Sequence, residues 1–387
     1  MNCRIAFLCA LAVLVSTAVC AQTAQTAAIN TPAETDVRKA AELVAAQPDY
    51  TPNHIALAIA YARRARETDD GSYLGKAEQT LGRALSADPD NFEALKARVF
   101  ILLSRHESAQ ALELATKINK RVPDDLTVRG YLVDANMDLG NYDDAVRETQ
   151  WMLNLRSGSA AALSRGAGLR ELHGDFAGAL QWLHMAYDST PGAETADRAV
   201  LLARISRLQL LAGKVMEAEK YATTALGIFP GHHEALRALA EVRLAQNRND
   251  EAVKLLETRY AAAPRAAFLF ALAGALDKAG KKDASAKAFA EFEQKALRES
   301  DAADNANHEL VSYYTDRAHQ PSQALRIATR EIARRHDALT LDSYAWALQA
   351  CRDYASADVE IKKALAFGIK DPEILRHARE ITGGRTE

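Results

Sequence analysis

An internal repeat of about 34 residues limits what this chain can fold into more than any other feature. Six prolines mark it, separated by 41, 34, 68, 39 and 34 residues, and 68 is twice 34: Pro48, Pro89, Pro123, Pro191, Pro230 and Pro264. Ser157 stands at the middle of the long gap. Twelve residues before Ser157 and before each proline from Pro89 onward stands an alanine: Ala77, Ala111, Ala145, Ala179, Ala218 and Ala252. Such a period is typical of an array in which each unit is one supersecondary element.

Each unit is predicted to be helix, tight turn, helix. Five residues before the repeated position stands Gly140, Gly174 or Gly213, and later units have Asn247 and Gly280 there. Gly and Asn tolerate the left-handed conformation that ends a helix. The second helix ends before the proline, because the residue before Pro is pushed out of the helical region. Composition agrees, since 78 of the 387 residues are Ala, which favours helix over strand.

This pattern resembles the tetratricopeptide repeat family. Its hallmarks are a 34-residue period, a small residue in the first helix, Gly at the turn, Ala where the helices cross and Pro at the end. The small first-helix positions here are Ala65, Val99, Val133, Ala167, Ser206, Ala240, Ala273 and Ala345. Small side chains let the two backbones approach closely. The resemblance implies an all-α, right-handed α-solenoid of stacked helix-turn-helix repeats.

The resemblance covers most of the chain. Residues 34–381 are expected to form the solenoid, with a lone opening helix around 37–47, nine helix pairs and a closing helix at about 372–381. Residues 382–387 are expected to be a tail. The unit at 305–335 is the least regular, and its register stays open.

Residues 1–21 are predicted to be a secretory signal peptide. Arg4 precedes an apolar run over 5–15, and small residues precede Gln22. The run is too short to span a bilayer comfortably. We therefore expect cleavage after Ala21, a flexible segment at 22–33, and an exported chain, periplasmic or secreted, with no membrane span.

Cysteine usage leaves one alternative for the leader. Cys3, Cys9 and Cys20 lie within it, so the mature chain keeps one thiol, Cys351, and can form neither an internal disulfide nor a Cys-rich metal site. Cys20 could instead carry a lipid anchor. Val19 argues against this, because Gly, Ala or Ser usually precedes a lipidated Cys.

No catalytic pattern emerges from the sequence. It has no Gly-rich phosphate loop, Gly-x-Ser-x-Gly elbow or His-Glu-x-x-His motif, so we predict no enzyme, no cofactor and no metal site. The run 232–234, His-His-Glu, is expected to open a helix. The net charge of −3 gives no basic field for nucleic acid, and the Arg-rich pieces at 61–66 and 330–335 are interpreted as solvated helix faces.

The resemblance also implies a ligand groove lined by the first helices. In the family, the second, fifth, ninth and twelfth residues of each first helix face the ligand. The groove residues implied here are Lys96, Phe100, Asp134, Glu171, Arg207, Arg237, Glu241, Asp342 and Trp346. Mixed charges with apolar positions suit an extended or helical protein segment. No ninth position has the Asn that chaperone-binding members use to grip a C-terminal carboxylate.

Two functions follow as hypotheses. Helical hairpins cannot bury their apolar faces alone, and stacking them creates one core and one long surface. The leading hypothesis is a non-enzymatic exported scaffold that binds a protein or peptide in the groove. The alternative is a structural adaptor, or a lipid-anchored subunit, of an envelope assembly or polysaccharide-export machine, acting through its convex or end surfaces. Neither the partner's identity nor the oligomeric state follows from the sequence.

Overall fold

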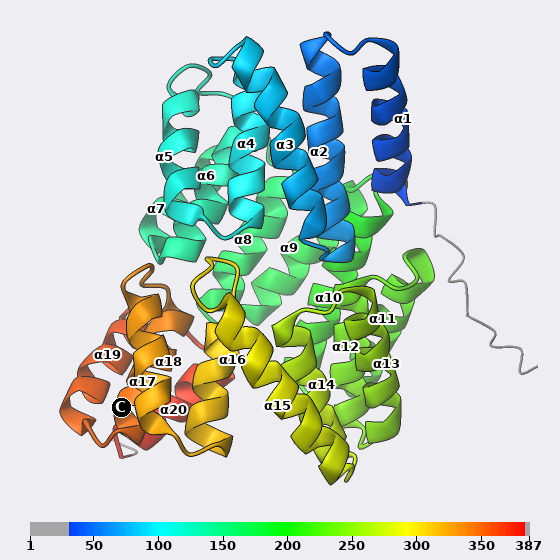
Figure 1. The fold of residues 1–387 in the computed structure, drawn as a ribbon. Coiled ribbons are helices and arrows are strands. Elements are labelled where there is room, and N and C mark those ends of the chain that lie inside the picture. Colours follow the sequence, from blue (N-terminus) through cyan, green and yellow to red (C-terminus); the bar gives the residue numbers. More distant parts are fainter. Residues whose placement is uncertain (1–30, 384–387) are drawn as a thin grey trace, which may run out of the picture. The chain divides into compact units, whose positions relative to one another are not determined.

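The computed structural model describes residues 31–383, and this part of the chain is built from stacked helices without a strand (Figure 1). The predicted all-α solenoid is therefore confirmed. The predicted signal peptide at 1–21, its cleavage site, Cys20 and most of the segment 22–33 lie outside the described residues, as does the end of the tail at 384–387. No helix among the described residues is both long enough and apolar enough to cross a membrane.

Within residues 31–383, nine helix pairs, from α2–α3 to α18–α19, follow the opening helix α1 and precede the closing helix α20. Consecutive helices pack against each other. The helices are α1 (Pro32–Ala46), α2 (Thr51–Thr68), α3 (Ser72–Ala87), α4 (Phe92–Ser104), α5 (Ser108–Asn119), α6 (Leu126–Leu139), α7 (Tyr142–Leu155), α8 (Ala160–Leu172), α9 (Phe176–Ser189), α10 (Thr195–Leu211), α11 (Val215–Ile228), α12 (His233–Ala245), α13 (Asn249–Ala262), α14 (Ala266–Lys278), α15 (Lys282–Glu299), α16 (Asn307–Ser312), the π-helix η1 (Tyr313–Arg317), α17 (Pro321–Ile332), α18 (Ala338–Ala350), α19 (Tyr354–Ala366) and α20 (Pro372–Ile381).

The opening helix begins two residues before the position at which the sequence predicts the array to start. Thr31 caps α1 by accepting the N–H of Glu34, and Pro32 occupies the first turn, where no N–H is needed. The Thr31 hydroxyl also donates to the buried carboxylate of Glu67 on α2, at 2.5 Å. A buried polar contact thus holds the first helix on the second.

The repeated small residues lie where paired helices cross. All six of the regularly spaced alanines are fully buried. Two serines also lie at helix crossings, Ser206 of α10 and Ser285 of α15, and both hydroxyls have a hydrogen-bond partner there. Ser206 donates to the carbonyl of Ala218 at 2.7 Å, and Ser285 donates to the carbonyl of Ala273 at 2.9 Å. Serine is tolerated there because a buried hydroxyl with a hydrogen-bond partner carries little penalty.

The predicted turn residues adopt the left-handed conformation. Gly140 has φ +82°, and Asn247 has φ +60°. At Gly140 a second constraint applies, because a Cβ atom would lie 2.5 Å from the carbonyl oxygen of His336. At Gly213, with φ +74°, a Cβ would meet nothing within 4 Å. Another part of the chain therefore packs against the turn at Gly140 and not against the turn at Gly213.

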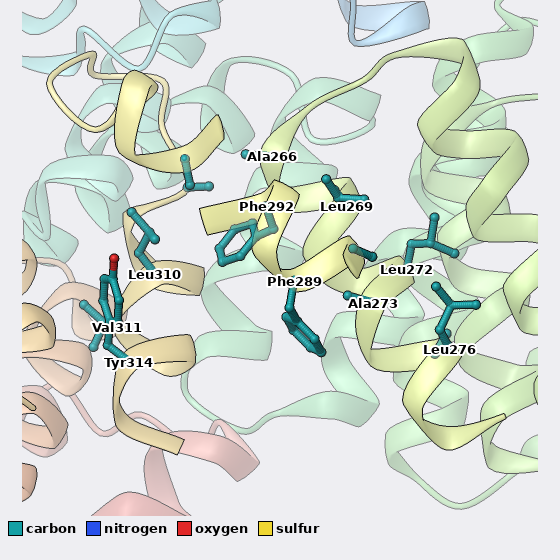
Figure 2. Close-up of a cluster of buried hydrophobic side chains, with 14 of the residues drawn as sticks. Ala266, Leu269, Leu272, Ala273, Leu276, Phe289, Phe292, Leu310, Val311 and Tyr314 are labelled. Carbon is teal, nitrogen blue, oxygen red and sulfur yellow. The ribbon is translucent and has the colours of Figure 1, made fainter. Parts of the chain in front are cut away.

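The irregular unit at 305–335 contains a π-helix. The short α16 continues into η1, whose wider turn shifts the register of the residues that follow. Large side chains fill the space beside it: Leu310, Val311 and Tyr314 lie in one buried cluster with Phe289 and Phe292 of α15 (Figure 2). Ala324 of α17 is fully buried, as are the repeated alanines of the regular units. The π-helix explains why the sequence repeat weakens here.

Candidate functional site

The predicted groove residues on α4 already have partners within the chain. The Lys96 ammonium lies 3.1 Å from the carboxylate of Asp125, which also caps α6. The ring of Phe100 stacks on that of Tyr131 of α6, with centroids 6.2 Å apart and planes 10° from parallel. Burial raises the pKa of Tyr131 well above its usual value, so this phenol is neutral at physiological pH. These contacts join two consecutive first helices.

Asp134 of α6 is held by α8. Its two carboxylate oxygens accept from Nε and Nη2 of Arg165, at 2.8 and 2.5 Å, which is the bidentate geometry of a strong ion pair. Arg165 Nε also donates to the carbonyl of Gly130 at 3.0 Å. A Cβ at residue 130 would lie 2.9 Å from Arg165 Cζ, so the glycine leaves room for the guanidinium.

A cavity of about 170 Å³ lies between α8, α10 and the start of α20. Its lining combines apolar walls with charged groups: Gly168, Glu171, Leu172, Phe176, Arg207, Leu211, Asp371 and Pro372. Glu171 and Arg207, both predicted groove residues, come from the first helices of consecutive pairs and form an ion pair. The Arg207 guanidinium also lies 3.8 Å from the carboxylate of Asp371.

Arg204 of α10 lies next to Glu171, one of the residues that line the cavity. Its guanidinium donates to the carbonyl and hydroxyl oxygens of Ser164, at 3.0 and 2.9 Å, and lies 3.8 Å from Glu171. Burial lowers the pKa of Arg204, although Glu171 opposes this. Glu171 therefore lies between two guanidiniums, and any charged group that enters the cavity competes with that arrangement.

Arg237 and Glu241 of α12 lie in a second charged cluster. Arg237 pairs with both Glu234 and Glu241 at 2.7 Å, and Glu234 also receives a hydrogen bond from Arg259 at 3.1 Å. Although burial opposes it, hydrogen bonding from His233 and the charge of Arg237 hold the pKa of Glu234 well below its usual range. Burial lowers the pKa of Arg259 to about 10. The carboxylate of Glu234 is thus ionised between two arginines.

The His-His-Glu run opens α12, as predicted. His232 is the buried N-cap residue, and its Nδ1 accepts the N–H of Glu234 at 3.3 Å. Burial lowers the pKa of His232 to about 3, so the ring is neutral and can accept this hydrogen bond. Cys351 is half-buried at the end of α18. Within residues 31–383, no three His, Cys, Asp or Glu side chains gather in a way that could hold a metal ion.

Comparison with known proteins agrees with the helical-repeat fold. Residues 209–276, which span α11 to most of α14, match the tetratricopeptide repeat family model. The fold is that of the tetratricopeptide repeat proteins. A crystal structure of the APC/C hetero-tetramer Cut9–Hcn1 is similar, with a TM-score of 0.55 and 13% identity, over 91% of this chain and 60% of that one. The chain thus spans less than two thirds of the Cut9–Hcn1 chain that it matches.

A second solved structure, of PilF from Pseudomonas aeruginosa, has a TM-score of 0.42 and 15% identity over 52% of this chain and 90% of that one. No curated protein sequence matches this chain. None of these comparisons indicates an enzyme family.

One expected groove residue of the tetratricopeptide repeat pattern departs from its predicted role. Asp342 of α18 is 2% exposed, because α20 packs against α18 and encloses it. Its carboxylate lies 2.8 Å from Nδ1 of His377 on α20. Trp346 stacks on the same imidazole with centroids 4.1 Å apart, and its indole N–H donates to Asp316 of η1 at 2.7 Å. Asp342 therefore stabilises the closing helix instead of facing solvent.

The Arg-rich piece at 61–66 is also different from the predicted solvated face. Two of its arginines, Arg63 and Arg66, reach repeats more than 100 residues away, and we call this contact the first seam. Three ion pairs form it, Arg63–Glu194, Arg66–Asp197 and Asp69–Arg265, with N–O distances of 2.7, 2.7 and 3.0 Å. His233 Nε2 also lies 3.3 Å from the carbonyl oxygen of Arg66. The interpretation as a solvated face is wrong for Arg63, which is half-buried between Glu194 and Asp36.

A second seam joins the turns after α6 and α8 to the last repeats. The N–H of Ala338 donates to the hydroxyl of Tyr142 at 2.8 Å, and the N–H of Lys370 donates to the carbonyl of Leu172 at 3.1 Å. Tyr142 also meets Phe367 edge to face at 4.7 Å, within a buried apolar cluster that includes residues of α18 and α20. A repeat pattern predicts contacts between neighbouring units only, so neither seam has a signal in the sequence.

Proposed function

We propose that this protein is a non-enzymatic scaffold that binds a segment of a partner protein along its first helices. The cavity between α8, α10 and α20 is the anchor site in this proposal. The observation that carries it is that Glu171 and Arg207, which the family resemblance and the repeat register assign to the ligand side, line this cavity. Two independent lines, the sequence register and the cavity, thus point to the same pair of residues.

The cavity suits one side chain of a partner. A closed apolar cavity of about 150 Å³ holds a benzene molecule, so about 170 Å³ is enough for one aromatic or branched aliphatic side chain. Leu172, Phe176 and Leu211 supply apolar walls, and the Glu171–Arg207 pair supplies polar groups beside them. An apolar pocket flanked by charged groups is the usual form of a binding hot spot.

Site-specific photo-crosslinking tests this proposal. A photoreactive amino acid replaces Leu211, which is 41% exposed at the cavity, and in a matched control it replaces Leu155, which is 49% exposed on the second helix α7. We expect one specific partner to crosslink at residue 211 and not at 155. An excess of the chain without the photoreactive amino acid is expected to compete for the partner and reduce crosslinking at 211. The same competitor with Leu211→Glu is expected not to compete. Crosslinking at 155 instead would contradict groove binding and favour an adaptor that uses its outer surface.

Export is a further part of the proposal, and it is supported by the leader pattern of residues 1–21. The mature chain would begin at Gln22. Mass spectrometry of the N-terminal peptide, on protein recovered from cell-envelope fractions, tests this directly. An intact leader would contradict export by cleavage, and a lipid on Cys20 would replace the soluble form by an anchored one.

A further inference from the structure

The first seam consists of charged contacts without a shared apolar core. The buried cluster that contains α2 is made of residues between Ile55 and Ile101, and within residues 31–383 no buried apolar cluster joins α2 to α10 or α14. The side chains of Arg66 and Asp197 are 52% and 42% exposed. Exposed ion pairs contribute little free energy and are screened by salt. This seam is therefore more sensitive to salt and to charged competitors than a contact with a buried apolar core.

At this seam two arginines on one turn of α2 face two acids at the start of α10. Arg63 and Arg66 stand three residues apart on α2, and Glu194 and Asp197 stand three residues apart at the start of α10. Residues three apart lie on one face of a helix. The guanidinium of Arg66 also lies 5.8 Å from the ring centroid of Phe100, a predicted groove residue. Two guanidiniums and one aromatic ring thus form a single surface on α2 and α4.

We propose that this surface, formed by Arg63, Arg66 and Phe100, docks an acidic helical segment of a partner. Glu194 and Asp197 occupy it in the free protein as an intramolecular competitor. The incoming helix carries carboxylates three residues apart, in the same spacing as the two acids of α10. The inference deepens the proposed scaffold function and rests on it, since it names the chemistry of the segment that lies along the first helices.

Glu194 and Asp197 have a second role besides occupying the surface on α2, and a test has to separate the two roles. Glu194 is the N-cap residue of α10 and Asp197 lies in its first turn. Acidic residues at a helix N-terminus stabilise the helix through its dipole, so both also favour α10 itself. If that were their sole role, their neutralisation would leave the affinity of α2 for an acidic helix unchanged. A competitor gives the opposite result, because its removal frees Arg66 and leaves Arg63 paired with Asp36 alone.

Binding of a defined peptide distinguishes the two roles. The probe is a fluorescent, end-capped helical peptide in an Ala and Gln background, with Glu and Asp three residues apart, and the control peptide has Gln and Asn there. Fluorescence anisotropy measures its affinity for the chain at low salt. We expect E194Q/D197N to bind the acidic peptide roughly two- to thirtyfold more tightly than the unchanged protein, the factor that corresponds to two ion pairs at the protein surface.

Two further variants complete the test. R63Q/R66Q is expected to lose the binding, and R147Q, which neutralises a 69% exposed arginine on α7, is expected to leave it unchanged. Circular dichroism melts check that each variant is folded. Equal affinity of E194Q/D197N and the unchanged protein would overturn the competitor, and retained binding by R63Q/R66Q would overturn the docking surface. Crosslinking at Leu211 is a separate readout, so failure here is distinguishable from failure of the proposed function.

Discussion

The two seams join distant parts of the same solenoid by opposite chemistry. At the first seam, α2 meets α10 through half-exposed ion pairs such as Arg63–Glu194. At the second seam, Tyr142 lies in a buried apolar cluster with residues of the last repeats, and its contact involves no charged group. Buried apolar contacts and hydrogen bonds persist when salt screens surface charges. The second seam is therefore a fixed structural contact, and the first is one that a charged partner can replace.

The largest expected effect is at the second seam. Tyr142→Ala removes a buried ring and leaves the N–H of Ala338 without its acceptor. Loss of a buried aromatic side chain costs about 3 to 5 kcal/mol of unfolding free energy. Tyr142→Phe keeps the ring and loses the hydrogen bond, which costs about 1 to 3 kcal/mol. Urea unfolding measures both, and equal losses would show that the ring contributes nothing.

Two glycines with similar φ, one at the second seam and one outside it, show how strongly the seam constrains a turn. Gly140→Ala and Gly213→Ala both place a side chain at a positive φ, of +82° and +74°. Only the first also forces a Cβ against the carbonyl of His336, at 2.5 Å. We expect Gly140→Ala to be more destabilising by about 1 to 3 kcal/mol, the usual cost of overpacking. Equal thermal and urea melts for the two variants would mean that His336 does not press on the turn.

The smallest expected effect is the pH dependence of the first seam. Burial raises the pKa of Asp69, although Arg265 opposes this. An acid with a raised folded-state pKa binds its proton sooner in the folded protein, so its contribution to stability increases as pH falls toward the usual Asp range. Asp69→Asn is expected to remove this contribution. Urea melts between about pH 4 and 6 should show that the free energy of unfolding rises less on acidification in the variant than in the unchanged protein. The same pH dependence in both proteins would rule out this role of Asp69.

The sequence predicted the features that repeat with the helix period. Ala145 and Ala179 are buried at crossings, and Gly140 ends its helix in the left-handed conformation, because each unit must solve the same local packing problem. It did not predict the π-helix at 313–317, since that insertion has no counterpart in the other units. Local periodicity thus determines the stack but not its exceptions.

The candidate site was predictable in position but not in its contacts. The register placed Glu171 and Arg207 on the ligand side, and both line the cavity. Asp371, which approaches Arg207 from α20, stands 164 residues further along the chain, and no repeat relates the two. Asp342 was placed by the same register, yet the closing helix encloses it. Contacts between distant units follow from how the whole array curves, and one unit's sequence does not contain that information.

Distances across both seams, measured in one salt titration, test the central claim most directly. With all four cysteines changed to Ser, one fluorophore pair at Ser72 and Ala193 reports the first seam, and another at Asn141 and Ala333 reports the second; these four labelled residues are exposed. Raising the salt from about 0.01 to 1 M shortens the screening length from about 30 to about 3 Å. We predict that the distance across the first seam lengthens and that the second does not change. Parallel changes at both seams, or none at the first, would contradict the account.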